Sequence, residues 1–351
     1  MSSELALACP VPVAETERVL LGHGSGGLLT AQLIEEVILP AFRNPALERL
    51  DDQAILPAPG PGECLAFTTD SYVVTPLFFP GGDIGQLAVN GTINDLAMGG
   101  ARPLALSLAF ILEEGLELDE LRRVVASAAA AAARAGVPIV TGDTKVVGRG
   151  SGDKVFINTS GVGAVPRGVD LSSRRVRPGD AILLSGTIAD HGATILAQRE
   201  GLMLDGELAS DTAPLHELAA ALLAACPDAH AMRDPTRGGL GATLVEIASR
   251  GRLDLEVREP LVPVRDAVRG ACELYGLDPL LLANEGKLVA FVPAAGAEAA
   301  LAALRAHPLG RDAVEIGRVT GAGEGVVVLR TALGSRRVLD LPYAEPLPRI
   351  C

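Results

Sequence analysis

The hydrophobic pattern of the first half of the chain predicts alternating helices and strands. After a glycine-rich turn, apolar residues recur at helical spacing over residues 28–38, and Pro40 is expected to end that helix. Further helices are predicted over Ile84–Met98, which stops at two glycines, and over the alanine-rich segment Leu118–Ala135. Strands are predicted over residues 64–69, 104–112, 137–141 and 155–165.

The second half continues this alternation after a polar, arginine-rich stretch with two prolines at 166–178, which predicts a domain boundary. Strands are expected at 181–185, 287–292 and 325–329, and helices at 191–200, 214–225, 240–249 and 296–306. We therefore expect an α/β (α+β) fold of two domains. The expected divisions are a glycine-rich segment and helix over 1–40, an N-terminal domain over 41–166, a C-terminal domain over 167–333 and a proline-rich tail over 334–351.

Composition narrows the class of protein. A length of 351 residues favours two domains, and 48% hydrophobic residues with 40 Gly and 24 Pro fit buried cores with many turns. A net charge of −13 and only 3% aromatic residues argue against nucleic acid as a partner. No apolar run predicts a membrane span, the N-terminus does not resemble a signal peptide, and the five cysteines show no metal-binding spacing. A cytoplasmic location is expected.

Acidic residues fall where α/β proteins collect ligand-binding groups. Asp70 and Asp143 are expected just after strands, Asp95 lies in a predicted helix, and Asp52 belongs to a turn-rich stretch. Any one of them is explained well enough as a turn residue or a helix cap. Four together, with threonines and glycines around them, favour a site for Mg²⁺ and a nucleotide. Lys145, two residues beyond Asp143, has the charge to offset a polyphosphate.

The glycine-rich turn at 22–27 has two interpretations. It could present backbone N–H groups to a phosphate at a helix start, or it could be only a tight turn. His23 within it is a candidate ligand or acid–base group, although a surface histidine is the commoner case. His191 is equally ambiguous, and a structural role is preferred for it.

Two polar motifs stand out in the second half. Asp234 and Pro235 suit the cap and first position of a helix, but the adjoining Thr236 and Arg237 exceed what a cap requires. Residues 284–287, with the sequence Asn-Glu-Gly-Lys, interrupt two apolar runs. Burying such a polar group costs free energy unless it faces a site.

The tail is a candidate for chemistry. Pro342, Pro346 and Pro348 favour an extended arm, and the residues from Asp340 to Cys351 would reach roughly 35–40 Å at the rise of polyproline II. A thiol on such an arm could visit its own active site and that of another protein. The alternative is a frayed terminus that happens to carry a cysteine.

Together these motifs resemble the HypE family of hydrogenase-maturation factors. The strings are HGSGG, FTTDSYVVTPLFFPGGDIG, GTINDLAMGGA, IVTGDTKVV, SGTIADHGATIL, RDPTRGGL, ANEGK and the final PRIC. The family belongs to the PurM-like ATP-binding superfamily, and the similarity runs from Leu21 to Cys351. It does not explain the first twenty residues.

The resemblance implies two PurM-like domains, a homodimer paired through the N-terminal sheet, and ATP between that sheet and the dimer mate. It also implies that a carbamoyltransferase, HypF, loads Cys351 with a carbamoyl group. The chain would then use ATP and Mg²⁺ to dehydrate that group to a thiocyanate. Its cyanide would pass to the iron of [NiFe]-hydrogenase on a HypC–HypD complex.

The resemblance also implies roles for individual residues. Cys351, Lys145 and Glu285 are the catalytic candidates, and which of the last two acts as the base is left open. The expected metal ligands are Asp52, Asp70, Asp95, Asp143 and Asp234. The ATP-binding candidates are those five together with Asn94, Thr141, Gly142, Thr144, Asn284 and Lys287.

Two rival functions remain open. A PurM-like kinase or synthetase acting on a small diffusible molecule would turn over without the tail. A non-enzymatic adaptor that docks through its proline-rich tail would not bind ATP, which would leave the clustered aspartates without a purpose.

Overall fold

The N-terminal half of the chain is built on a four-stranded sheet. The computed structural model describes residues 17–25, 28–50, 53–201, 208–340, 347 and 350–351. The strand order is β1-β6-β4-β5, antiparallel except for the parallel pair β4 and β5. The strands are β1 (Glu63–Tyr72), β4 (Arg102–Glu113), β5 (Ile139–Val147) and β6 (Val155–Pro166), and the short strands β2 (Phe78–Phe79) and β3 (Gly82–Asp83) form a separate pair.

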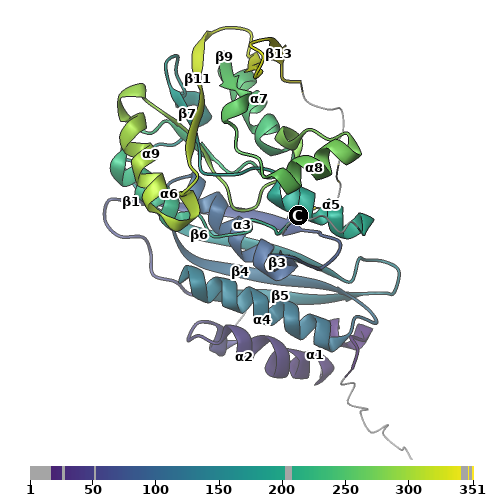
Figure 1. Cartoon of the computed structure of the whole chain (residues 1–351). Coiled ribbons are helices and arrows are strands. Elements are labelled where there is room, and N and C mark those ends of the chain that lie inside the picture. The colour runs from purple at the N-terminus through teal and green to yellow at the C-terminus, as the bar shows by residue number, and fades with distance from the viewer. Residues whose placement is uncertain (1–16, 26–27, 51–52, 202–207, 341–346, 348–349) are drawn as a thin grey trace, which may run out of the picture.

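Helices cover one face of this sheet (Figure 1). Helices α3 (Ile84–Met98) and α4 (Leu118–Ala135) pack there, and their apolar residues share one core with the inward side chains of β4. Asp83 caps α3 by accepting bonds from the backbone N–H groups of Gly85 and Gln86. The opposite face carries exposed apolar side chains, because Leu65, Phe67 and Ile111 are 62%, 68% and 39% exposed.

The N-terminal helix lies beside α4 and is interrupted once. It comprises α1 (Leu28–Leu33), a π-helical turn over Ile34–Ile38, and α2 (Leu39–Phe42). The expectation that Pro40 ends the helix is wrong, because Pro40 lies in the first turn of α2, where a missing N–H is tolerated.

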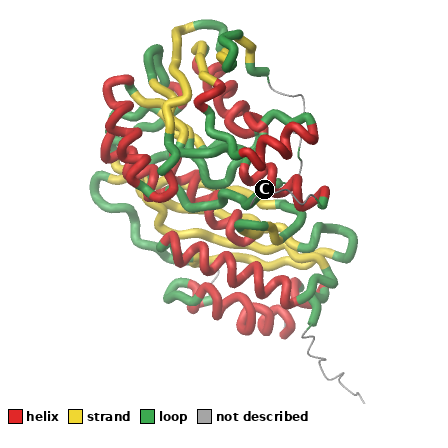
Figure 2. The backbone as a smooth tube through the Cα atoms, viewed as in Figure 1, coloured by secondary structure: helices red, strands yellow, loops and turns green. Residues whose placement is uncertain are grey.

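The C-terminal half contains a seven-stranded mixed sheet (Figure 2). The order is β13-β12-β9-β11-β7-β10-β8, in which only β9 and β12 pair in parallel. The strands are β7 (Ala181–Leu184), β8 (Ala231–Arg233), β9 (Leu253–Arg258), β10 (Val289–Val292), β11 (Val314–Ala322), β12 (Val327–Arg330) and β13 (Arg336–Val338). The helices are α5 (Asp190–Glu200), α6 (His216–Ala225), α7 (Gly239–Gly251), α8 (Asp266–Tyr275) and α9 (Ala297–Ala306).

The central strands of this sheet are buried on both faces. Every residue of β7 and β10 is buried, and neighbouring residues such as Ile182 and Leu183 enter different core clusters on the two sides. This explains why both strands have continuous apolar sequences. None of the helices in the described part of the chain is long and apolar enough to cross a membrane.

The structure confirms the expected α/β architecture and corrects several details. Asp70 and Asp143 lie inside β1 and β5 rather than after them, because sheet pairing continues to Tyr72 and Val147. Asp234 does not cap a helix, since α7 begins only at Gly239, preceded by Gly238 with a φ of 74°. The prediction from the hydrophobic pattern also missed β9, β11 and helix α8, although in β9 buried apolar residues alternate strictly with charged ones.

Candidate active site

The tip of the tail lies between the two halves of the molecule, next to α5 (Figure 1). The backbone N–H of Val73, just after β1, donates to the carbonyl oxygen of Cys351 over 3.2 Å. The Ile350 side chain is 1% exposed and belongs to the N-terminal core cluster. The Ile350 carbonyl oxygen lies 2.7 Å from Nε2 of His191. The tail tip is therefore docked in the protein.

Cys351 lines a small cavity whose other residues come from both halves. The volume is about 30 Å³, comparable to the volume of one water molecule. The cavity walls are strongly acidic and also contain one arginine. The lining residues are Asp70, Ser71, Tyr72, Gly91, Asp95, Asp234, Thr236, Arg237, Glu285 and Cys351.

Among the carboxyl groups of the cavity, Glu285 has the properties expected of a catalytic residue. It is 3% exposed and accepts a side-chain hydrogen bond from Cys351. Burial, followed by the charges of Asp211 and Asp234, raises the pKa of Glu285 well above its usual range. Its Oε1 atom is buried and has no hydrogen-bond partner among the described residues. The cavity therefore contains an unused acceptor beside the thiol.

Three aspartates share the same surroundings. Burial raises the pKa of Asp95, although a 2.8 Å hydrogen bond from the Thr68 hydroxyl partly opposes this effect. Burial and the neighbouring charge of Asp95 raise the pKa of Asp234 to about 7. Asp70 adds to the raised pKa of both. These carboxylates lack sufficient positive charge nearby, which is the condition that a bound cation would relieve.

Several predicted ATP-binding residues form contacts that hold the site together, and their binding of ATP stays a prediction. The Asn94 side chain accepts from Leu215 N–H over 2.7 Å and donates to the carbonyls of Ala213 and Glu285. The Asn284 side chain accepts from Ala189 N–H and donates to the Pro235 carbonyl, both over 2.7 Å. Because these amide groups already bind backbone, their role in this conformation is to position the loops around the cavity.

Lys287 also forms an ion pair within the protein. Its Nζ lies 3.1 Å from Oδ2 of Asp211, and the two side chains are 12% and 3% exposed. Burial alone would raise the pKa of Asp211, but Lys287 and the backbone N–H of Glu285 hold it below its usual range. Asp211 also accepts from the N–H of Gly286 over 3.2 Å, so this ion pair fixes the backbone that carries Glu285.

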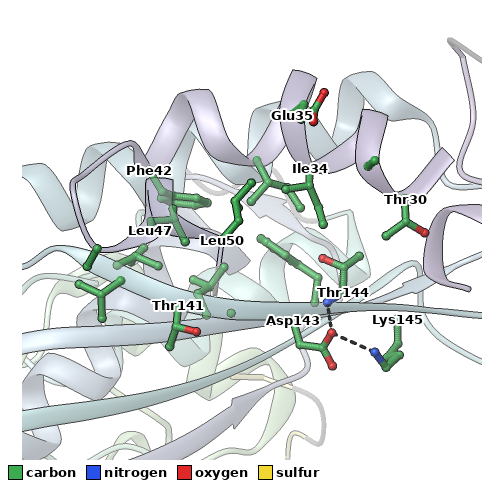
Figure 3. Close-up of a pocket in the computed structure, with 18 of the residues that line it drawn as sticks. Thr30, Ile34, Glu35, Phe42, Leu47, Leu50, Thr141, Asp143, Thr144 and Lys145 are labelled. Atoms are coloured by element: carbon green, nitrogen blue, oxygen red, sulfur yellow. Dashed lines mark hydrogen bonds and ion pairs between the residues drawn. The ribbon is translucent and has the colours of Figure 1, made fainter. Parts of the chain in front are cut away.

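A second, larger pocket lies between the N-terminal helix and strand β5 (Figure 3). Its volume is about 460 Å³, in the range of small-molecule sites. Apolar side chains of the helix and of β4 form much of its wall, and Thr141–Lys145 of β5 also line it. Gly142 fits only as glycine, since a Cβ there would collide with the Leu108 carbonyl. Gly24 lines the pocket and leaves similarly little room against Val146.

Neighbouring residues of β5 project from opposite faces of the sheet. Thr144 is buried and points toward the helices, whereas Thr141 and Asp143 extend the other way (Figure 3). Asp143 Oδ1 lies 2.9 Å from Nζ of Lys145, and both side chains are about 60% exposed. The structure thus separates Asp143 and Lys145 from Cys351, which corrects the expectation of one carboxylate group and leaves Lys145 without a contact to the thiol.

The predicted metal ligands are consequently divided. Asp70, Asp95 and Asp234 line the Cys351 cavity, Asp143 lies at the β5 pocket, and Asp52 falls outside the described residues. Within the described ranges, no three His, Cys, Asp or Glu side chains are arranged closely enough to hold a metal ion. The assignment of these carboxylates to Mg²⁺ stays a prediction.

The structure adds functional candidates that the sequence did not single out. Tyr72 lines the Cys351 cavity and is 2% exposed, and Asp211 orients the Glu285 loop. His191, whose role the sequence left ambiguous, binds the newly found Ser210 through Nδ1 and the tail through Nε2. His23 is buried rather than at the surface, and its Nδ1 accepts from Leu20 N–H over 2.9 Å. The Ala-Asp-His-Gly motif, which forms the start of α5, was the available signal for His191.

Comparison with known proteins shows the class and the family of the chain. Residues 50–165 match the N-terminal domain, and residues 177–330 the C-terminal domain, of the AIR synthase related proteins. The fold and its site therefore define a two-domain protein of that class. Carbamoyl dehydratase HypE of Cupriavidus necator is 53% identical over 352 residues, which cover all of both chains. The chain belongs to the HypE family.

Solved structures agree with this assignment. A structure of hydrogenase maturation protein HypE in complex with ATP is 53% identical, with a TM-score of 0.91 over 95% of this chain and 99% of that one. A structure of a HypE–HypF complex matches with 46% identity and a TM-score of 0.77, over 88% of this chain and 99% of that one.

Replacing Asp234 with Asn should change how stability depends on pH. Because the folded-state pKa is about 7 and the ordinary value is 3.8, the folded protein retains a proton that the unfolded chain releases between those values. The wild-type free energy of unfolding should therefore fall as pH rises through this window, and Asp234→Asn should remove that contribution.

Urea unfolding at pH 5 and pH 8 measures the effect. Relative to wild type, Asp234→Asn should gain stability at the higher pH. The control Asp119→Asn, whose side chain is 87% exposed, should keep the wild-type trend. Parallel pH profiles for wild type and Asp234→Asn would contradict the raised pKa.

Proposed function

We propose that the chain is an ATP-dependent carbamoyl dehydratase that acts on a carbamoyl group carried by its own Cys351. The observation that carries this proposal is the docked tail, which delivers the Cys351 thiol to the buried carboxyl of Glu285. The curated relative at 53% identity is named a carbamoyl dehydratase, and a solved relative binds ATP.

The reaction balances with one ATP for each carbamoyl group. The carbamoyl oxygen attacks the γ-phosphorus, and ADP leaves. The carbon–oxygen bond then breaks, phosphate departs with that oxygen, and nitrogen loses both of its protons as the carbon–nitrogen triple bond forms. Cys351 ends as a thiocyanate, and one proton is released beyond the one held by phosphate. Phosphorylation is needed because an amide oxygen is a poor leaving group and phosphate a good one.

Glu285 is positioned to take a proton from nitrogen. Glu285 lines the cavity that contains the thiol and its Oε1 has no partner among the described residues, so a carbamoyl N–H on Cys351 would find an acceptor on this carboxyl group. The raised pKa makes the ionised carboxylate a stronger base than an exposed glutamate. The geometry therefore favours Glu285 over Lys145 as the base.

The β5 pocket is our proposed ATP site. Its apolar wall suits an adenine ring, and Asp143 and Lys145 lie beside it on the opposite face of the edge strand β5, where phosphates that pass around the edge would meet them. Asp143, Ala109, Asn158 and Ser71 lie opposite one another in successive strands. Three strand spacings separate Asp143 from Ser71, or about 14 Å. A polyphosphate directed along this row would point from Lys145 toward the Cys351 cavity.

Asp70, Asp95 and Asp234 are the residues that would hold Mg²⁺ near the tail, with ATP oxygens and a closer approach of the two halves completing a site that the three side chains do not form by themselves. Hard oxygen ligands suit this ion, and burial first, then the neighbouring carboxylates, raises the pKa of both Asp95 and Asp234. When bound, Mg²⁺ would neutralise charge on the transferring phosphoryl group. The three side chains come from β1, α3 and the segment after β8, so closure of the two halves sets their spacing.

Three partners are proposed. A solved relative forms a complex with HypF, which we propose loads Cys351 in the cytoplasm. A HypC–HypD complex would accept the cyanide. A second copy of the chain would cover the bare face of the N-terminal sheet, where Leu65, Phe67 and Ile111 are exposed. Asp143 extends from the same face, so the second copy would also border the nucleotide.

The proposed reaction should change the mass of the C-terminal peptide in two steps. With HypF, carbamoyl phosphate and ATP, the peptide that ends in Cys351 should gain a carbamoyl group. It should then become one water lighter in a step that needs this protein's ATP site. Cys351→Ser should bind ATP normally but yield no thiocyanate, whereas Cys64→Ser, which alters an exposed thiol, should behave as wild type. A diffusible-substrate kinase would remain fully active as Cys351→Ser.

The base prediction separates Glu285 from Lys145. The dehydration rate should rise with pH in the wild type, because only ionised Glu285 accepts a proton. Glu285→Gln should lower the rate by about 100-fold and abolish that rise, with little change in the KM for ATP. Lys145→Ala should raise the KM and keep the pH profile. Single-turnover rates on carbamoylated protein measure both, and an unchanged profile in Glu285→Gln would exclude it as the base.

The dimer prediction uses sedimentation velocity. Wild type should sediment as a dimer and Phe67→Asp as a monomer, since a charge would lie in the apolar contact. Leu333→Asp is the matched control, because Leu333 is 96% exposed and lies in the C-terminal half. A monomeric wild type at micromolar concentration would refute the sheet-to-sheet contact.

A further inference from the structure

His191 lies in a directed chain of hydrogen bonds that ends on the tail. Its ring is fully buried, with Nε2 2.7 Å from the Ile350 carbonyl and Nδ1 2.8 Å from Oγ of Ser210. A carbonyl can only accept, so Nε2 must carry the proton and donate. In the neutral ring Nδ1 then accepts from the Ser210 hydroxyl, whose oxygen in turn accepts from Thr212 N–H over 3.2 Å.

Each group in this series of hydrogen bonds can only donate or only accept toward the next, which fixes the orientation of the His191 ring. Burial lowers the pKa of His191, which is consistent with a neutral imidazole. The ring also meets Phe79 edge to face, with centroids 5.4 Å apart. The donor at Nε2 is therefore held ready at the place where the tail carbonyl arrives.

A second bond to the tail comes from the backbone, where Val73 N–H donates to the main-chain oxygen of Cys351. A substitution cannot easily remove that backbone bond, whereas the His191 bond depends on one side chain. The two bonds flank the Ile350–Cys351 peptide and, with the buried Ile350 side chain, define the docked position.

A docked tail is poorly placed for loading. Cys351 is only partly exposed and shares its cavity with Glu285, so another enzyme can reach the thiol only after the tail leaves. The fraction of molecules with a docked tail can undergo dehydration, and the fraction with an undocked tail can be loaded. Any contact made only in the docked state shifts that division by its own free energy.

We infer that His191, oriented by Ser210, is the positioning residue that holds the tail in the docked state and so sets the balance between loading of Cys351 and dehydration of its carbamoyl group. The inference builds on the proposed function by assigning the control of its two half-reactions to one side-chain donor. A histidine that only filled the core would instead affect both half-reactions and overall stability together.

The first experiment needs neither ATP nor a partner. It follows alkylation of Cys351 by N-ethylmaleimide, read from the mass of the peptide that ends in Cys351. His191→Ala should react at least about fivefold faster than wild type, because the docked state loses a buried hydrogen bond. His191→Gln, which retains an N–H donor at a similar reach, should stay within about twofold of wild type.

A matched control tests loss of a buried histidine as such. His230 is 6% exposed and pairs with Asp180 over 2.7 Å, and it makes no hydrogen bond to the tail residues that the structure describes. His230→Gln should leave the alkylation rate at Cys351 unchanged even if it lowers the melting temperature. Equal acceleration in His230→Gln and His191→Ala would overturn the inference, as would a wild-type rate in His191→Ala.

The second experiment separates the two half-reactions. His191→Ala should accept carbamoyl from HypF at least as fast as wild type but dehydrate it at least about fivefold more slowly in a single turnover, and His191→Gln should largely restore dehydration. Slowing of both steps together would show a structural defect and refute the positioning role. If wild type forms no thiocyanate while its tail is still protected from alkylation, the proposed function fails and the docking role of His191 stands.

Discussion

The arrangement depends on keeping one carboxyl group out of water among other carboxyl groups. Glu285 lies at the junction of the two halves, where burial and like charges both oppose its ionisation. Burying such a group costs free energy, so other contacts must hold the surrounding backbone in place. The Asp211–Lys287 ion pair provides that support, because Asp211 also accepts the N–H groups of Glu285 and Gly286.

Two buried asparagines, Asn94 and Asn284, also hold the backbone around Glu285 in place. Asn94 connects helix α3 to the segment before α6 and to the Glu285 carbonyl, and Asn284 connects the Glu285 loop to the turns at Ala189 and Pro235. Each amide satisfies backbone groups that would otherwise be buried without partners. Asn94 thus joins the two halves beside Glu285, and Asn284 fixes the loop that carries Glu285.

The sequence predicted the two α/β halves and the helices Ile84–Met98 and Leu118–Ala135, because strong periodicity and glycine stops coincide there. It also selected Glu285 and Cys351. It could not divide the aspartates correctly, since the side on which Asp143 points depends on the β4–β5 register and on where the strand ends. Nor could it recognise Asp211 or Ser210, ordinary polar residues that gain a role only through contacts distant in sequence.

A docked tail has a consequence for throughput. On the proposed function the substrate is part of the chain, so its effective concentration at Glu285 is set by the reach of the tail and does not depend on dilution in the cell. Competing amides at ordinary metabolite concentrations would have little chance of displacing it. Each molecule, however, holds one substrate at a time, so output can rise only through faster reloading or through synthesis of more copies of the chain.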